Sequence, residues 1–512
     1  MLELKTIISY LSKQKIGQID LITDPTNLDD KTKMLYNGIK DGLINTDEEA
    51  IDLIYKDPNK KETYRKLKYR LTQRLTNTIF LTDVQNSVKS EFGKSNLTLV
   101  KNWGALEILK WQGHNVHYRE QVEKLLNSAI RLNRLDIAIN IAKNQKIRYG
   151  IFEYNKAKYN KYKKLLAQLM SEYQLEMEAQ EIYTELAYTI VHNKSQTYNE
   201  AIKDLEKRLV KLHDQASNTD NQDIKFKIYN SFYFVGMIKK DLDLMTKYCT
   251  LALEYFHSTK WNDVGIYSFT QKMGLIHLSK QEYSTALHYF NECLKYNTKP
   301  GSMRWQYHYN YKFLTQLLLK EYDQAYITIS TLMNHKLFNK LKSNFKQPWY
   351  LKEALMHFLI RLGKVNPNEI SAGKMRSFRL SRFLNEVQNP SSDKKGQNVT
   401  VNIIELLFLL LGNDHDKTMS KINSLKQYSF RNLKGAEHLR KRTFIKMLSK
   451  LEDGSYNRKR IEAKANNHIS KLKESPMDFS EQNLQIEIMP YEQLWSEIMY
   501  LLEIKHQNEY IT

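Results

Sequence analysis

The sequence predicts an all-α fold, because residues that form turns are scarce and a long segment contains no helix breaker. The 512 residues include 17 glycines and 8 prolines, well below the ~7% and ~5% of average usage, which leaves too few turns for a β-sandwich or a many-looped α/β enzyme. No proline lies between Pro58 and Pro300 to interrupt a helix. Hydrophobic residues make up 41% of the chain, so we expect a folded protein rather than a disordered one.

The first region, residues 1–100, is predicted to be helical from its capping signals. Thr46 and Glu49 have the spacing of a capping box at the start of one helix, and the Asp57-Pro58 turn ends it. Asn59 and Glu62 repeat the capping-box spacing before a longer helix. The two helices, within residues 47–80, have the outline of a helix-turn-helix, although the turn is longer than the ~3 to 4 residues usual in that motif.

The longer helix has one apolar face and one polar face. At ~100° per residue, Tyr64, Leu67, Leu71 and Leu75 fall on one side. The residues broadly opposite could contact phosphates and base edges, and they are Arg65, Lys66, Tyr69, Arg70 and Gln73. Two interpretations stay open, a nucleic-acid contact surface and a solvated face in a lysine-rich protein.

A repeat pattern lies in the middle of the chain, at residues 267–300. Met273-Gly274 is followed by Tyr283, Ala286 and Phe290 at spacings of three and four. This segment resembles a tetratricopeptide repeat, a 34-residue helix-turn-helix unit. Small residues at Gly274 and Ala286 would let two antiparallel helices approach closely, while Tyr283 and Phe290 fill the space toward the next hairpin.

Weaker copies of this pattern occur on both sides. Their residues are Leu135, Ala138 and Ala142; Tyr198, Ala201 and Leu205; Leu242, Met245 and Cys249; and Tyr322, Ala325 and Ile329. Because the small-residue positions are irregularly spaced, we predict a divergent tetratricopeptide-like α-solenoid of antiparallel helical hairpins over residues 101–365. The alternative is an irregular helical bundle that contains one chance match.

The C-terminal region, residues 366–512, is also predicted to be helical. Its polar loop at 389–398 is the best linker candidate in the chain. The apolar run at 401–412 carries Glu405 and falls far short of the ~20 residues that span a bilayer, so we expect a buried core helix there and no membrane insertion. Near the end, Leu494, Ile498 and Leu501 recur at helical spacing and predict a docked terminal helix.

A second resemblance rests on three phrases of the C-terminal region, FRLSRFLNEV at 378–387, FIKML at 444–448 and PYEQLW at 490–495. With the helical N-terminal region, they resemble an uncharacterised family of large bacterial cytoplasmic proteins that have divergent tetratricopeptide-like repeats. The resemblance spans nearly the whole chain. It implies the fold and no known chemistry.

No motif in the sequence predicts catalysis, a cofactor or a metal. Gly93-Lys94-Ser95 matches the end of a phosphate-binding loop, but Val88 stands where the first glycine is required. His114 and His117 have no further ligand at suitable spacing, and the cluster at 414–416 is typical of a polar turn at a helix end. We therefore expect a non-enzymatic protein, although an enzyme whose catalytic groups come from distant segments stays an alternative.

Charge and cysteine content indicate the kind of partner and the compartment. Lys and Arg number 78 against 57 Asp and Glu, a net charge of +21, so an acidic partner is expected. The basic residues cluster at 60–74, 156–164, 376–382, 440–442 and 458–460. Cys249 and Cys293 lie in amphipathic segments without a disulfide framework, and no signal peptide is recognised, so we expect a cytoplasmic protein.

The leading functional interpretation is therefore an interaction scaffold or adaptor that binds an acidic protein or peptide. The alternative is a nucleic-acid-binding or regulatory protein that uses the basic N-terminal helices. The sequence leaves the identity of the partner and the oligomeric state open.

Overall fold

The computed structural model describes most of the chain, and the described part is all-helical, without strands. The described residues are 1–11, 29–80, 90–111, 115–192, 200–259, 263–296, 299–370, 373–387, 397–412, 414–435, 438–453, 458–475, 477, 479 and 487–509. Most of the predicted loop at 389–398 lies outside them. The chain divides into two compact units: residues 1–178 with 216–224, and residues 179–215 with 225–512. The three predicted regions stay predictions; the boundary at residue 100 would fall inside a helix.

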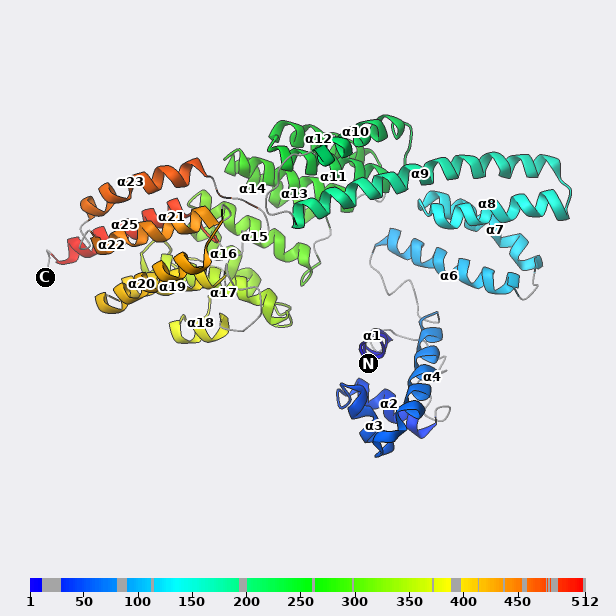
Figure 1. The fold of residues 1–512 in the computed structure, drawn as a ribbon, viewed down its shortest axis with the longest axis horizontal. Helices are drawn as coiled ribbons and strands as arrows, with labels where there is room; N and C mark the ends of the chain where they lie inside the picture. Colours follow the sequence, from blue (N-terminus) through cyan, green and yellow to red (C-terminus); the bar gives the residue numbers. More distant parts are fainter. Residues whose placement is uncertain are drawn as a thin grey trace. The chain divides into compact units, whose positions relative to one another are not determined.

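The N-terminal helices of the first unit share a small core of their own. They are α1 (Leu2–Leu11), α2 (Asp30–Lys40), α3 (Asp47–Tyr55) and α4 (Lys61–Ile79), with a short 3-10 turn at Pro58–Lys60 before α4 (Figure 1). Leu35, Leu67 and Leu71 are buried at its centre. The predicted capping box is confirmed, because the Thr46 side chain accepts a hydrogen bond from the Glu49 backbone while the Glu49 carboxylate accepts one from the Thr46 backbone.

The second predicted capping box is wrong. Asp57 caps the 3-10 turn by accepting a hydrogen bond from the Asn59 backbone N–H at 2.9 Å. Lys60 stands at the N-cap of α4 without a side-chain cap, and Glu62 pairs with Arg65 instead. Lys56, with φ of 51°, is the left-handed C-cap of α3, and Asp57 directly after it is the N-cap of the 3-10 turn.

The rest of the first unit is a set of longer helices. They are α6 (Glu91–Trp111), α7 (Asn115–Arg131), α8 (Leu135–Ile147) and the first part of α9 (Lys156–His192), with a π-helical turn at Arg148–Phe152 between α8 and α9. Buried aliphatic residues of α6, α7 and α8 form one core with Tyr162 and Leu169 of α9. Gly93, Lys94 and Ser95 lie within α6, and Lys94 pairs with Glu91 one turn away.

The second unit opens with packed helical hairpins. Its helices up to residue 361 are α10 (Glu200–Gln215), α11 (Gln222–Lys239), α12 (Leu242–Ser258), α13 (Asp263–Ser279), α14 (Tyr283–Glu292), α15 (Met303–Leu318), α16 (Tyr322–Met333) and α17 (Ser343–Arg361). Each helix from α12 to α17 packs against the next one along the chain. Gly274 is a point of tight packing between α13 and α14, since a Cβ there would lie 2.5 Å from the Phe290 ring.

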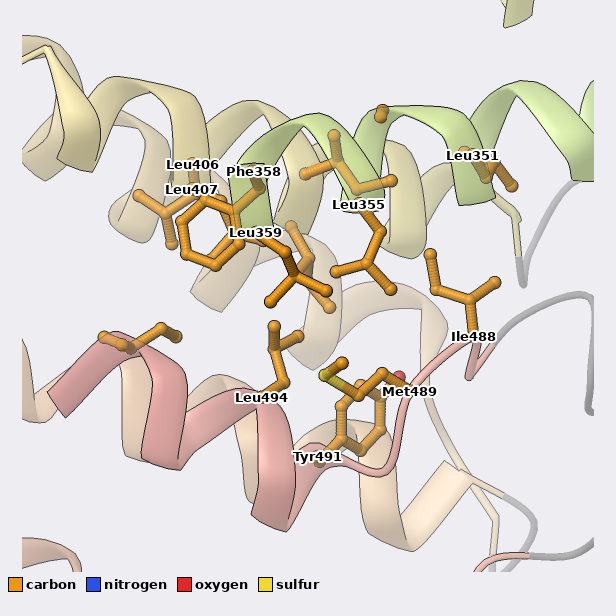
Figure 2. Packing of buried hydrophobic residues seen from close by; sticks show 14 of the residues in the cluster. Leu351, Leu355, Phe358, Leu359, Leu406, Leu407, Ile488, Met489, Tyr491 and Leu494 are labelled. Atoms are coloured by element: carbon orange, nitrogen blue, oxygen red, sulfur yellow. The ribbon is translucent and has the colours of Figure 1, made fainter. Parts of the chain in front are cut away.

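The remaining helices surround the largest core of the second unit. They are α18 (Leu380–Val387), α19 (Gln397–Leu411), α20 (His415–Asn432), α21 (Leu439–Leu448), α22 (Lys450–Asp453), α23 (Arg458–Glu474) and α25 (Tyr491–Glu509). Figure 2 shows side chains of α17 and α19, among them Phe358 and Leu407, facing Met489 and Leu494. The buried helix predicted at 401–412 and the docked terminal helix are both confirmed, because Leu407 and Ile498 are completely buried.

Candidate functional site

The exposed face of α4 is the candidate site that sequence and structure both single out. Tyr64, Leu67, Leu71 and Leu75 anchor the opposite face in the core, with exposed fractions of 2% or less. That burial turns outward the five predicted contact residues, all of which are exposed: Arg65, Lys66, Tyr69, Arg70 and Gln73. We call these five the α4 face.

The α4 face combines cations with one free aromatic ring. Arg65, Lys66, Tyr69 and Arg70 line a shallow surface hollow. The Tyr69 side chain is 65% exposed, so its ring is available to stack on a ligand. Arg65 also pairs with Glu62, but both side chains are more than 70% exposed, and such a pair contributes at most about 1 kcal/mol. A stronger anion could therefore displace Glu62.

The polar groups beside the α4 face hold the bundle together. Asp47, at the start of α3, accepts hydrogen bonds from the Tyr64 hydroxyl at 2.6 Å and from Lys68 Nζ at 2.9 Å. Desolvation acts to raise the pKa of Asp47, but these hydrogen bonds outweigh it and hold the pKa below its usual value. Lys68 is therefore a structural cation that ties α3 to α4, and we leave it out of the α4 face.

The helix-turn-helix outline stays a prediction. Helix α4 packs on α1 and α2, and α3 packs on α2 and on the 3-10 turn. The connection from Tyr55 to Lys61 contains that 3-10 turn, so it is longer than the ~3 to 4 residues usual in the motif, as its sequence already indicated.

Two arginines in the basic clusters of the C-terminal region are bound by carboxylates, so these clusters are only partly free. Arg376 binds Glu353 and Glu386, each at 2.6 Å. Arg440 binds Glu487 at 2.6 Å and Glu492 at 2.7 Å, and its side chain is only 11% exposed. Glu353, Glu487 and Glu492 lie 23 or more residues away along the chain, and Glu386 lies ten residues from Arg376 in α18, so helical periodicity did not reveal the pairing.

The predicted repeat positions are mostly buried between helices. Ala138, Ala286 and Ala325 are completely buried, Met273, Phe290 and Tyr322 are less than 10% exposed, Gly274 is buried, and Tyr283 is partly buried. The predicted packing role is wrong for Ala201, because this residue is exposed on α10. That helix buries Ile202, Leu205, Leu209 and Leu212 instead, so Ala201 falls one position outside the apolar stripe and cannot admit a neighbouring helix.

The same turn connects the two helices in each of four hairpins, and it was not predicted from the sequence. Asn133, Lys240, Gln281 and Lys320 have positive φ angles of 55°, 57°, 61° and 59°. In each case the next backbone N–H donates to the carbonyl five residues earlier, as in a Schellman motif. The signal that could have revealed these turns is a polar pair followed by leucine or tyrosine, as in Gln281-Glu282-Tyr283.

Helices α11 and α13, the first helices of two hairpins, are largely covered by the chain itself. Helix α11 is buried along most of its length, and Phe234 stacks on Tyr183 of α9 with ring centroids 5.6 Å apart. Lys272 of α13 lies over the Tyr233 ring at 5.2 Å. The C-terminal residues Met477 and Phe479 pack against α13, α14 and α15. A groove along these helices is thus at least partly filled by intramolecular contacts.

The described residues contain no group of three or more His, Cys, Asp or Glu side chains that could hold a metal ion. Asp414 caps α20 by accepting a hydrogen bond from the Lys417 backbone N–H, in keeping with the predicted polar turn. His114 and the side chain of His117 lie outside the described residues. Burial raises the pKa of Cys249 and of Cys293 to about 12, which makes neither thiol a nucleophile at neutral pH.

No helix in the described part of the chain is both long and apolar enough to cross a bilayer.

Comparisons with known proteins do not assign the chain to a family. No protein-family model, no curated protein and no solved structure matches this chain.

Proposed function

We propose that this chain is a non-enzymatic helical-repeat interaction protein, a scaffold or adaptor, that binds an acidic partner. The observation that supports it best is the unequal neutralisation of its positive charge. Cations such as Arg376 and Arg440 are bound by buried carboxylates, whereas Lys66 and Arg70 are exposed on the α4 face. Attraction between exposed cations and an acidic surface acts over about 10 Å at moderate salt, so it would steer such a partner to α4.

In this proposal the repeated hairpins form the helical scaffold of the protein. Four hairpin turns share one backbone geometry, and small residues bring helices together at Ala286 and Ala325. These features support a tetratricopeptide-like α-solenoid. Because α11 and α13 are mostly buried, we expect partner contacts on exposed cationic surfaces rather than along these two helices.

A second candidate function is nucleic-acid binding, and the exposed Tyr69 ring favours it. A tyrosine between Lys66 and Arg70 could stack on an unpaired base while the cations contact phosphates. An acidic protein segment would use the cations and would not require the ring. The two candidates therefore differ in what the loss of Tyr69 should do.

Affinity capture from a native lysate separates the two candidates. It is run at low and at physiological salt, with nuclease added to half of each sample. The test variant carries Lys66→Glu and Arg70→Glu. The matched control carries Lys207→Glu and Lys211→Glu, two exposed lysines of α10. A protein that stays bound after nuclease and is lost only with the test variant supports the first function. Retention by the test variant contradicts the role of the α4 face.

Direct binding measurements test the nucleic-acid candidate further. We expect the logarithm of the affinity for a duplex to fall with log salt by about 0.9 per phosphate contacted. Tyr69→Ala should weaken binding to a single strand by about 1–3 kcal/mol while leaving duplex binding nearly unchanged, because only unpaired bases can stack on the ring. Equal affinity of wild type and an Arg65→Glu, Lys66→Glu, Arg70→Glu variant would rule this candidate out.

We also propose a cytoplasmic location. The support is that both cysteines are unpaired and buried, as expected for a protein that folds in a reducing compartment.

A further inference from the structure

The turn between α8 and α9 exposes several apolar side chains within one short segment. Ile151, Phe152 and Tyr154 are 60%, 72% and 84% exposed, and Ile147, one turn earlier, is 38% exposed. Figure 1 shows the chain reversing direction here, from α8 into α9. We call these four residues the apolar tip. Exposed apolar groups gathered at one place are characteristic of a binding surface, whereas single ones are common everywhere.

The backbone of the apolar tip is fixed by hydrogen bonds. The Glu153 N–H donates to the Arg148 carbonyl at 3.0 Å, which closes the π-helical turn, and the Asn155 N–H donates to the Tyr149 carbonyl at 2.9 Å. Asn155 also accepts a hydrogen bond from the Lys158 N–H and so caps α9. The exposure of the side chains is therefore built into an ordered turn.

Aromatic residues beneath the apolar tip anchor it to the core of the first unit. Tyr149 is 5% exposed and stacks on Tyr162, with ring centroids 5.7 Å apart. The Tyr162 hydroxyl donates a hydrogen bond to Glu123 of α7 at 2.7 Å. One tyrosine of the turn thus faces inward and holds it, while Phe152 and Tyr154 are exposed.

Basic residues outnumber acidic ones in the segment that carries the apolar tip, although Lys161 lies 3.9 Å from Glu123 of α7. Between residues 143 and 164 the only acidic residue is Glu153, and its carboxylate is bound by Arg148 at 2.7 Å and faces Arg119 at 3.6 Å. The basic residues of this stretch are Lys143, Lys146, Arg148, Lys156, Lys158, Lys161, Lys163 and Lys164. A ligand for the tip must therefore combine an apolar layer with dense negative charge.

We propose that the apolar tip docks on the surface of an anionic phospholipid bilayer. Ile151 and Phe152 would enter the boundary between head groups and acyl chains, and the surrounding lysines would contact phosphate and carboxylate head groups. No spanning helix is needed for such peripheral binding.

The choice of a bilayer over a nucleic acid follows from the residue types. Between residues 143 and 164 the basic residues are lysines, which act as point charges, except Arg148, and both Arg148 and Arg119 of α7 face Glu153. Nucleic-acid sites more often use arginine for bidentate contacts and aromatic rings for stacking. Two isoleucines cannot stack on bases, whereas aliphatic and aromatic residues together suit the interface of a bilayer. This inference does not rest on the function proposed for the α4 face.

Vesicle co-sedimentation of the full chain tests the proposal. The vesicles contain phosphatidylcholine with about 30% phosphatidylserine, or phosphatidylcholine alone. We expect binding to the anionic vesicles only, and a loss of about tenfold or more for Phe152→Ser, because the aromatic ring is removed from the interface. The matched control is Phe430→Ser, which changes a phenylalanine of α20 that is 84% exposed and should leave binding unchanged.

A charge-reversal pair completes the test. Lys163→Glu with Lys164→Glu should reduce binding by about tenfold or more and weaken its dependence on salt, whereas Lys207→Glu with Lys211→Glu should not. Equal binding to both vesicle types, or unchanged binding of Phe152→Ser, overturns the proposal. So does a result in which the tip variants lose a single-stranded oligonucleotide but keep the vesicles, because the tip would then be a nucleic-acid site.

Discussion

At the scale of single residues, close contacts between helices depend on glycine and alanine at particular positions. Gly274 has no space for a side chain, because an added Cβ would come within 2.5 Å of the Phe290 ring, and Phe290 itself is 1% exposed and cannot move away freely. Gly104 in α6 is a contrasting case, since the nearest atom to an added Cβ would be 3.8 Å away.

The two glycines give opposite predictions for the same substitution. Gly274→Ala should lower the free energy of unfolding by about 1–3 kcal/mol, because overpacking outweighs the gain in helix propensity. Gly104→Ala should raise it by up to about 1 kcal/mol, because the propensity gain is unopposed. Urea denaturation of both variants measures the difference, and a stabilised Gly274→Ala would show that α13 and α14 are not tightly packed there.

At the scale of helices, buried ion pairs fix the C-terminal elements to one another. The Arg440 guanidinium of α21 lies between Glu487 and Glu492, and it also donates to the backbone carbonyl of Leu472 at the end of α23. Desolvation raises the pKa of Glu487 even though Arg440 acts in the opposite direction. The carboxylate therefore depends on its one strong partner to remain charged.

Removing Arg440 alone should lower the free energy of unfolding more than removing the charges of both Arg440 and Glu487. We expect Arg440→Leu to lower the free energy of unfolding by about 3–5 kcal/mol, because Glu487 is left buried without a counter-charge. Adding Glu487→Gln should recover part of the loss, since no charge then remains buried. Denaturation of the two single variants and the double variant measures this coupling. Purely additive effects would mean that the two side chains do not interact.

At the scale of the whole molecule, buried titratable groups set how stability depends on pH. Burial lowers the pKa of His308 and of His357 to about 4, below the ~6.5 of an unfolded chain. These histidines bind a proton mainly after unfolding, so acidification favours the unfolded state. Burial likewise lowers the pKa of Lys352 to about 7, which acts in the same direction between about pH 7 and 10.5.

We therefore expect stability to fall as the pH decreases from about 6.5 to 4, by about 1.4 kcal/mol per pH unit for each histidine in the middle of that range. His308→Gln should remove one such contribution. Denaturation at pH 5 and pH 6 gives the slope, and the wild-type slope should exceed that of the variant. The same slope for both proteins would mean that His308 is protonated equally in the folded and unfolded states.

The local features of this protein follow from the order of its amino acids. Scarce glycine and proline made it helical, and the spacing of Leu67, Leu71 and Leu75 decided which side of α4 would face water, because periodicity depends only on neighbours along one helix. Which cations are free depends instead on how the helices pack. Arg440 and Arg376 looked like Lys66 in the sequence, but Glu487 and Glu353, which lie 47 and 23 residues away along the chain, bind them. Helix packing also decided which patterned positions are buried: Ala201 carried the repeat spacing and faces solvent. Charge neutralisation and packing depend on residues far apart in the chain, which a local pattern cannot contain.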